Sequence, residues 1–530
     1  MRRWNGWGDE ATHYPLPDSA TRYLETIIGT GQPIADATFD QVIASVPQSS
    51  LTPHAHITTD PAERLYHARG QSLPDWVALR SGRVDVFPGG VAYPESDDDV
   101  RTLFAYARRN GTHLIPYGGG TSVVGHINPR ANDAPTLTVD LSRLNRLIDL
   151  DEVSHLATFE AGVCGPDLER QLNAHGYTLG HFPQSFELST LGGWIVTRSS
   201  GQQSYHYGRI EDLFAGGHVE TPCGPIDLLP LPASAAGPDL RQMILGSEGR
   251  FGIVTRAIVR VQRRPEVEAF YGVFFHDWQS GADAVREIAQ AHVPVSMLRL
   301  SDAQETETTL KLSGKDKLIE WAKRGLNLIN YKPERALLIL GVTGDKAATH
   351  HAYHTAMSIA HKHGGFMTGV MIGRLWRKSR FLTPYLRNTL WERGYAIDTL
   401  ETALPWSKVE PTAIAIKNVI RDGLKERNEH LLVFAHLSHV YADGASIYVT
   451  YLWRRANDPD ETLQRWQLLK RAASNLIVAQ GGTISHQHGV GVDHAPYLKA
   501  EKGELGLKMI EAVRSRLDPD RILNPGKLID

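Results

Sequence analysis

The chain has few of the features that mark secreted, membrane-spanning or nucleic-acid-binding proteins. Only two of its 530 residues are cysteines, Cys164 and Cys223, which excludes a disulfide framework and is typical of a reducing compartment. No continuous apolar stretch approaches the length that spans a bilayer. The formal net charge of −3 gives no overall attraction to nucleic acid. Tryptophan and glycine follow Met1-Arg2-Arg3 instead of an apolar run, so we expect no secretory signal and a cytoplasmic protein.

A run of three glycines at the end of a predicted strand dominates the first half of the sequence. Leu114 and Ile115 lead into the loop Pro116-Tyr117-Gly118-Gly119-Gly120-Thr121-Ser122. Without side chains, backbone N–H groups can turn inward, and a run of such dipoles binds an anion. The two hydroxyl groups add donors. Taken alone, the loop would favour interpretation as a flexible turn, because an isolated glycine motif is a weak signal.

The surrounding pattern favours a phosphate-bearing cofactor. We expect a helix from Asp97 to Gly111, strands at 112–115, 137–140 and 155–162, and a helix from Pro166 to Gly176. No G-x-G-x-x-G opens a helix, so this is an α+β domain of short elements and not a Rossmann unit.

Two further glycine-rich stretches follow. The first runs from His181 to Gly208 and combines small hydroxyl residues with apolar residues that indicate burial. The second is Gly246-Ser247-Glu248-Gly249-Arg250-Phe251-Gly252-Ile253-Val254-Thr255, ahead of an alternating strand at 257–261. A backbone with so few large side chains can lie against a flat ring system and a diphosphate.

These three stretches resemble the cofactor-binding signature of the vanillyl-alcohol-oxidase, or PCMH-type, FAD-binding flavoproteins. Within that group the chain is most similar to the alkyldihydroxyacetonephosphate synthase family of ether-lipid synthesis. The likeness begins at Trp4-Asn5-Gly6-Trp7-Gly8 and covers nearly the whole chain. Its most specific segments are Phe182-Pro183, Ser189-Thr190, Gly192-Gly193-Trp194-Ile195, Tyr207-Gly208 and Ile210-Glu211-Asp212.

The resemblance implies an α+β fold, with a two-subdomain FAD-binding domain under an α/β cap. The expected parts are a mainly helical segment at 1–83, the FAD domain at 84–264, the cap at 265–480, and a C-terminal segment at 481–530 that returns to the FAD site. Neither cysteine lies in a motif for covalent flavin attachment, so we expect non-covalent FAD.

The residues expected to bind FAD come from all three stretches. Gln184 stands where the synthases carry aspartate, which predicts an altered cofactor hydrogen bond. The full set is Pro116, Tyr117, Gly118, Gly119, Gly120, Thr121, Ser122, Pro183, Gln184, Ser185, Ser189, Thr190, Gly193, Thr197, Ser199, Ser200, Glu248, Gly249, Gly252, Ile253 and Val254.

Two arginines of the cap are candidates for anion binding. Arg299 lies in an apolar, strand-like run and needs an anionic partner, for which Asp302 is the nearest candidate. Arg387 by itself would be read as a solvated helix residue. The resemblance places both in the active site, where two guanidinium groups would suit a phosphate.

The segment from His436 to Tyr448 decides between two chemistries. His436-x-x-His439 could be a metal pair, and FAD-dependent 2-hydroxy-acid dehydrogenases carry H-x-G-D-G-N-x-H with a metal-binding glutamate in a later G-E-H-G. Here Ile447 and Tyr448 replace the second histidine, and Ser485-His486-Gln487-His488-Gly489 has no glutamate. We therefore expect no metal.

By resemblance Tyr448 is the proton-transfer residue, assisted by His486 and His488. A phenol of ordinary pKa is a poor base, so nearby arginines or reduced hydration would have to tune it. Gln487 replaces the middle one of three consecutive histidines in the synthases, and glutamine cannot relay protons by titrating.

The resemblance implies a redox-neutral exchange of the acyl group of acyl-dihydroxyacetone phosphate for a long-chain alcohol, by way of N5 of the flavin. The alternative is an FAD-dependent dehydrogenase or oxidase of a 2-hydroxy acid or related alcohol. A long-chain substrate also predicts peripheral membrane contact, and the family predicts a homodimer.

Overall fold

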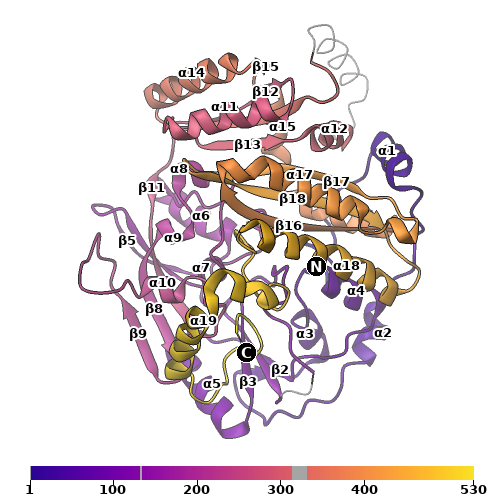
Figure 1. The fold of residues 1–530 in the computed structure, drawn as a ribbon. Coiled ribbons are helices and arrows are strands. Elements are labelled where there is room, and N and C mark those ends of the chain that lie inside the picture. Colours follow the sequence, from indigo (N-terminus) through magenta and orange to yellow (C-terminus); the bar gives the residue numbers. More distant parts are fainter. Residues whose placement is uncertain (1, 132–133, 313–330, 530) are drawn as a thin grey trace.

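Two small sheets from the first half of the chain lie beneath one large sheet from the second half (Figure 1). The computed structural model describes residues 2–131, 134–312 and 331–529. The mixture of helices and sheets agrees with the predicted α+β class.

The first small sheet holds the glycine loop at the end of its edge strand, β3 (His113–Tyr117). Its order is β1-β2-β4-β3, with the last three strands parallel. Helix α5 (Asp97–Asn110) begins after Ser96, whose side chain accepts from the N–H of Asp99, and ends at Gly111 with φ 58°. The strands are β1 (Ile57–Thr58), β2 (Gly90–Ala92), β3 (His113–Tyr117) and β4 (Thr136–Asp140).

The second small sheet is antiparallel, in the order β5-β6-β10-β8-β9. Helices α6 (Gly165–Ala174) and α7 (Leu191–Thr197) contribute to its core, and so do partly buried residues of α19 (Leu498–Leu517) from the end of the chain. The strands are β5 (Leu147–Asp151), β6 (Leu156–Glu160), β8 (Phe214–Thr221), β9 (Gly224–Leu228) and β10 (Ile253–Arg260).

The large sheet has the order β15-β12-β14-β13-β17-β18-β16. The residues of β14 are buried almost throughout, as a strand covered on both faces requires. The strands are β12 (Val267–Phe275), β13 (Met297–Ser301), β14 (Ala336–Gly344), β15 (Phe366–Met367), β16 (Tyr395–Pro405), β17 (Leu432–Val440) and β18 (Gly444–Arg454). Helices α11 (Trp278–Gln290), α14 (Lys346–Lys362), α17 (Trp406–Asp422) and α18 (Pro459–Gln480) contribute to its core.

Both ends of the chain are tied to distant elements. Trp7 is buried. Its backbone N–H donates to Asn388 Oδ1 (3.1 Å), and Asn388 Nδ2 donates to the Trp7 carbonyl (3.0 Å). Trp7 therefore ties the start of the chain to the segment around Asn388. At the other end, the Leu114 N–H donates to the Ile522 carbonyl (2.7 Å), so the chain returns beside β3.

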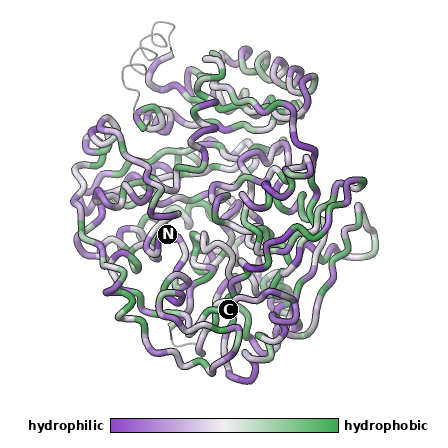
Figure 2. The backbone as a smooth tube through the Cα atoms, turned by 180° about the vertical axis from the view of Figure 1, so that it is seen from behind, coloured by the Kyte–Doolittle hydropathy of each residue, from purple (hydrophilic) through white to green (hydrophobic). Residues whose placement is uncertain are grey.

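The remaining elements are shorter or lie at the edges. Hydrophobic and hydrophilic segments are mixed along the backbone (Figure 2), and no helix in the described ranges is long and apolar enough to cross a membrane. These elements are α1 (Asp18–Ile28), α2 (Phe39–Ala44), α3 (Pro61–Tyr66), α4 (Leu73–Ser81), α8 (Ser204–Tyr207), α9 (Ile210–Leu213), α10 (Arg241–Ile244), α12 (Ala303–Leu312), α15 (Met371–Ser379), α16 (Thr383–Glu392), β7 (Tyr177–Thr178), β11 (Gln262–Arg263), η1 (Lys425–Arg427) and η2 (Ala495–Tyr497).

Candidate active site

The structure brings the three glycine-rich stretches together. A Cβ on Gly119 would lie 1.7 Å from the Leu188 carbonyl oxygen, and one on Gly249 would lie 2.9 Å from Cγ of Pro116. The N–H of Glu248 donates to the carbonyl of Val196 in α7 (3.0 Å). Glycine is therefore required where one stretch crosses another.

The glycine loop has the donors that a diphosphate requires. Within the described part of the chain, the backbone N–H groups of residues 118–122 donate to no protein acceptor, although the loop is half-buried. Backbone donors in such a place are normally paired, so this run fits the anionic part of FAD.

Several expected cofactor residues also brace one another. Thr190 caps α7 by accepting from the Gly193 N–H, Thr197 donates to the Gly193 carbonyl, and Ser189 accepts from Trp194 Nε1. Ser199 and Ser200 lie against buried imidazoles, those of His181 (3.2 Å) and His439 (3.2 Å). The hydroxyl groups therefore hold this stretch in position.

The side chains of two expected cofactor residues form hydrogen bonds to other segments of the chain. Gln184 Nε2 donates to the Arg380 carbonyl (2.6 Å), which joins the cofactor stretch to the segment that leads into α16. The Glu248 carboxylate accepts from the N–H groups of Val490 and Gly491 (2.5 and 2.9 Å). The side chain of Glu248 therefore binds the C-terminal segment to the FAD domain.

One row of polar side chains crosses three strands of the large sheet. In the register of β17, β18 and β16, His436 pairs with Tyr448 and Tyr448 pairs with Glu401. The rings of His436 and Tyr448 stack at 5.0 Å and 21°, and the ring of His488 meets Tyr448 edge-on at 5.8 Å. Tyr448 and His488, predicted from distant segments, are thus neighbours.

Arg299 lies at one end of this row, but its partner differs from the expected one. Arg299 Nη2 donates to Glu305 Oε1 (2.7 Å), and His436 Nδ1 lies 3.0 Å from the same oxygen. The prediction of Asp302 was wrong: that carboxylate pairs with Lys417 (2.8 Å). Asp302 directly follows Ser301 and stands just before α12, where its Oδ1 accepts from the Glu305 N–H (2.8 Å), so its carboxylate is engaged at the start of the helix.

The phenol of Tyr448 is protonated in this environment. Its hydroxyl donates to Thr399 Oγ1 (3.1 Å), and burial raises its pKa well above the ordinary value, against the lowering effect of that hydrogen bond. Of the two influences considered, Arg299 lowers the pKa, but burial raises it by more. The hydroxyl of Tyr448 therefore carries a proton that it could donate.

Arg387 is a cation with unused donors. Its guanidinium lies 4.3 Å from the ring centre of Trp76, and Nη1 donates to the Gln71 carbonyl. Nε and Nη2 are buried without a protein partner, and burial lowers its pKa to about 10. Two free N–H groups in a buried place fit an anionic oxygen pair.

His486 is held by a residue that the sequence did not single out. Arg209 Nη1 donates to His486 Nε2 (2.6 Å), and Nη2 donates to the His486 carbonyl (2.9 Å). Burial, together with His439 and Arg209, lowers the His486 pKa well below its ordinary value. Its Nδ1 is buried without a protein partner.

His436 and His439 do not form a metal pair, because they contact different groups. His439 Nε2 lies 3.1 Å from Gln487 Oε1, while its Nδ1 faces the hydroxyls of Ser200 and Ser204. An amide oxygen only accepts, so Nε2 carries the proton. Gln487 thus supplies an acceptor to a neutral imidazole, whose pKa burial lowers to about 3.

Glu401 positions the predicted histidine segment and was also missed. Its Oε1 accepts from the N–H groups of Gln487 (2.6 Å) and His488 (2.8 Å), and its Oε2 is buried without a partner. Burial lowers the pKa of His488, against the opposing charge of Glu401. A single glutamate in a strand gives no motif from which to find it.

Comparisons with known proteins agree with this geometry. Residues 88–226 match the FAD binding domain family, and residues 264–528 match the FAD linked oxidases, C-terminal domain. The chain is 31% identical to alkyldihydroxyacetonephosphate synthase of Dictyostelium discoideum over 89% of its length and 78% of that protein. The chain belongs to the alkyldihydroxyacetonephosphate synthase family. The Trypanosoma brucei brucei synthase is also 31% identical, over 89% of this chain and 78% of its own.

The family likeness extends to the tertiary structure. A solved alkyldihydroxyacetonephosphate synthase superposes with a TM-score of 0.84 and 25% identity, covering 99% of this chain and 98% of that one. As a member of this family the chain is an FAD-dependent enzyme with a PCMH-type fold, as the sequence predicted.

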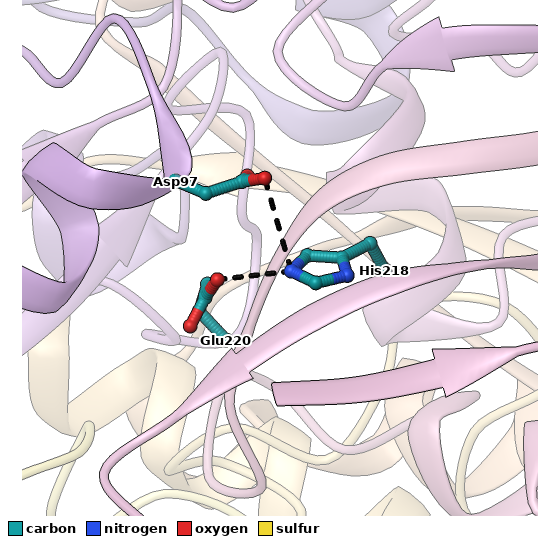
Figure 3. Close-up of side chains that lie close together, drawn as sticks. All are labelled: Asp97, His218 and Glu220. Carbon is teal, nitrogen blue, oxygen red and sulfur yellow. Dashed lines mark hydrogen bonds and ion pairs between the residues drawn. The ribbon is translucent and has the colours of Figure 1, made fainter. Parts of the chain in front are cut away.

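A second cluster of possible ligands lies away from the synthase-type site, between α5 and β8 (Figure 3). His218 Nε2 lies 2.9 Å from Glu220 and 3.8 Å from Asp97, and Nδ1 lies 2.6 Å from Asp227. Arg256 pairs with Asp97 (3.1 Å) and Arg101 approaches Glu220 (3.7 Å). A protonated His218 and two arginines balance three carboxylates, so the cluster joins the two subdomains as an ion-pair network.

Proposed function

We propose that the chain exchanges the acyl group of acyl-dihydroxyacetone phosphate for a long-chain alcohol, a redox-neutral synthesis of an ether lipid precursor. Arg387 carries this proposal, because its two buried, unpartnered N–H groups lie close enough to Tyr448 to influence it electrostatically. A phosphate or a leaving carboxylate would satisfy both donors beside a proton donor.

FAD, when bound, supplies the electron-rich ring atom through which the C1–O bond is exchanged without net oxidation. The free N–H groups of residues 118–122 and the hydroxyl residues of the second stretch would hold it. Cys164 occupies the N-cap position of α6 and its Sγ donates to Asp167 Oδ2 (3.4 Å), while Cys223 is exposed; we propose that neither is linked to the flavin. We propose that acid-denatured protein releases all its FAD.

The cap residues have separable roles in this proposal. Tyr448 holds a proton at its hydroxyl and delivers it to the departing oxygen. His488 is neutral and accepts a proton from the incoming alcohol or C1. Arg299 pairs with Glu305, so it orients His436 against the Tyr448 ring and adds positive potential for the substrate anion.

We also propose a cytoplasmic enzyme that touches a membrane surface and forms a homodimer. The unpaired cysteines support a reducing compartment, and a long-chain substrate resides in membranes. Sedimentation equilibrium would measure the dimer, and fractionation of cells would measure the membrane share.

The test is an anaerobic assay without an electron acceptor. FAD-loaded protein is mixed with an acyl-dihydroxyacetone phosphate and a long-chain alcohol, and lipids are identified by mass spectrometry. Ether product together with free fatty acid is the expected result. No product, with the flavin bleached by a 2-hydroxy acid, would overturn the proposal in favour of a dehydrogenase.

A further inference from the structure

The residues expected to bind FAD include no positively charged side chain. None of those in the three glycine-rich stretches is a lysine or an arginine, and one of them, Glu248, is a carboxylate. The diphosphate of FAD carries negative charge on both phosphates, while backbone N–H groups contribute only partial positive charges. A cation close to the glycine loop would therefore strengthen the binding of FAD.

The side chain of Arg2 lies against the glycine loop. Its Nη2 donates to the hydroxyl of Tyr117, and its guanidinium carbon lies 5.7 Å from the centre of the Tyr117 ring. A Cβ on Gly120 would lie 2.6 Å from the same Nη2. The guanidinium thus contacts the loop whose N–H groups, in the described part of the chain, donate to no protein acceptor.

The segment that carries Arg2 is held by contacts of its own. The N–H of Arg3 donates to the Gly8 carbonyl (2.9 Å), and Arg2 pairs with Asp9 in an antiparallel bridge. The buried Trp7 lies within this turn. These contacts fix the backbone from which Arg2 reaches the loop.

The charge of Arg2 is not neutralised by a direct ion pair. Within residues 2–131, 134–312 and 331–529 no carboxylate pairs with Arg2, whereas Arg80, for example, pairs with Asp36 (2.7 Å). Desolvation opposes the charge, but Tyr117 and the more distant Asp140 raise the pKa of Arg2 on balance, so the guanidinium is a cation. Arg2 is also exposed, so the N–H groups that Tyr117 does not use are open to a ligand.

Tyr117 sets the direction of this guanidinium. The Tyr117 ring is buried and its centre lies 4.5 Å from that of the His67 ring. Its hydroxyl donates to the Tyr66 carbonyl (3.5 Å) and accepts from Arg2. A phenol held on both sides gives the guanidinium a fixed partner at the loop.

We propose that Arg2 belongs to the FAD site and supplies, at the glycine loop, the positive charge that offsets the diphosphate. The free N–H groups of residues 118–122 and this guanidinium would bind the diphosphate together. Guanidinium groups suit phosphate oxygens, and a charge in a partly desolvated place acts more strongly than one in water. The inference concerns the binding of the cofactor and holds whichever reaction the enzyme catalyses.

The test measures the affinity of the full-length protein for FAD. FAD is titrated into protein from which the flavin has been removed, and the quenching of flavin fluorescence is followed. R2M and R2Q should raise the dissociation constant of FAD at least about tenfold, while R2K, which keeps the charge, should raise it less. Salt should weaken FAD binding more in wild type than in R2M, because salt screens the charge of Arg2.

The matched control is R3M, which removes one positive charge from the neighbouring residue. Arg3 Nε donates to the Asp9 carbonyl (3.2 Å) and not to the glycine loop, so R3M should bind FAD like wild type. The flavin-free proteins should unfold at equal temperatures, and FAD should raise the unfolding temperature of R2M less than that of wild type.

Three outcomes would overturn the proposal. R2M that binds FAD like wild type would exclude Arg2 from the site, and an equal loss of affinity in R3M would show an effect of net charge alone. R2Q with the affinity of wild type would show that Arg2 acts through its hydrogen bond to Tyr117 and not through its charge. If R2M proved unstable, the comparison of R2K with R2Q would still decide, because both keep a hydrogen-bond donor and only R2K keeps the charge.

Discussion

Arg209 fixes the tautomer of His486. A guanidinium only donates, so the 2.6 Å contact from Arg209 Nη1 makes Nε2 of the imidazole an acceptor and leaves the proton on Nδ1. Tyr441 lies 2.6 Å from the same Nε2, and the ring stacks on His439 at 4.9 Å. His486 therefore presents a directed N–H donor, and Arg209 is its positioning residue.

Replacing Arg209 should change the pH dependence of catalysis. Burial and His439 contribute most to the lowered pKa of His486, and R209M removes the next contribution, so the pKa should rise in part and kcat/KM should fall at acidic pH where wild type keeps it. Nitrogen NMR should show the Nδ1–H tautomer in wild type and a mixture in the variant. R209K keeps the charge and should shift the acid limb less. An unchanged profile and tautomer in R209M, with normal flavin content, would refute the role.

Removing the hydroxyl of Tyr448 tests it as the proton donor. Y448F leaves the ring stack with His436 intact, so the fold and bound FAD should be unaffected, while turnover drops about 100-fold or more. The control is Y106F in α5, where the lost hydrogen bond goes to the Thr52 carbonyl far from the site. Y448F with normal turnover would show that another group delivers the proton.

Neutralising Arg387 should weaken substrate binding without destabilising the protein. In R387M a buried cation with two unpartnered N–H groups is replaced by an apolar chain, so the unfolding temperature should stay equal or rise. KM for the phosphate-bearing substrate should rise at least about tenfold. R421M, an exposed arginine of α17, serves as the control. An unchanged KM in R387M would show that Arg387 does not bind the phosphate of the substrate.

The ion-pair network around His218 predicts a pH-dependent stability. Burial opposes the charge, but hydrogen bonds to Glu220 and Asp227 raise the His218 pKa on balance. A raised folded pKa means that the stabilisation is complete below the unfolded value of about 6.5 and is lost as pH rises through the folded value. H218Q should therefore lower the unfolding temperature more at about pH 6 than at about pH 9.

The controls for this network distinguish ion pairs from a metal. H361Q, at an exposed position of α14, should show no such pH dependence. EDTA should leave the unfolding temperature of wild type unchanged, because the two arginines already balance the carboxylates. A temperature that falls with EDTA and recovers with zinc would replace the ion-pair interpretation by a metal site.

The sequence by itself determined the parts of this protein that depend on local chemistry. Glycines mark the anion-binding loop because no other residue lets one backbone pass so close to another at Gly119 and Leu188. Helical spacing with an acidic start and Gly111 at the end located α5. The likeness of these segments to a flavoprotein family predicted the class of enzyme and its cofactor, FAD.

Only the tertiary structure decided how the charged side chains are paired. Arg209 and Glu401 hold the histidine segment from positions 277 and 86 residues away along the chain. Glu305, not Asp302, neutralises Arg299, because strand pairing and the start of α12 set which carboxylate returns to the sheet face. Burial, and not the neighbouring Arg299, decided the direction in which the pKa of Tyr448 shifts. The desolvation of a titratable side chain depends on every element that the fold packs around it, so it cannot be predicted from the residues near it in the sequence.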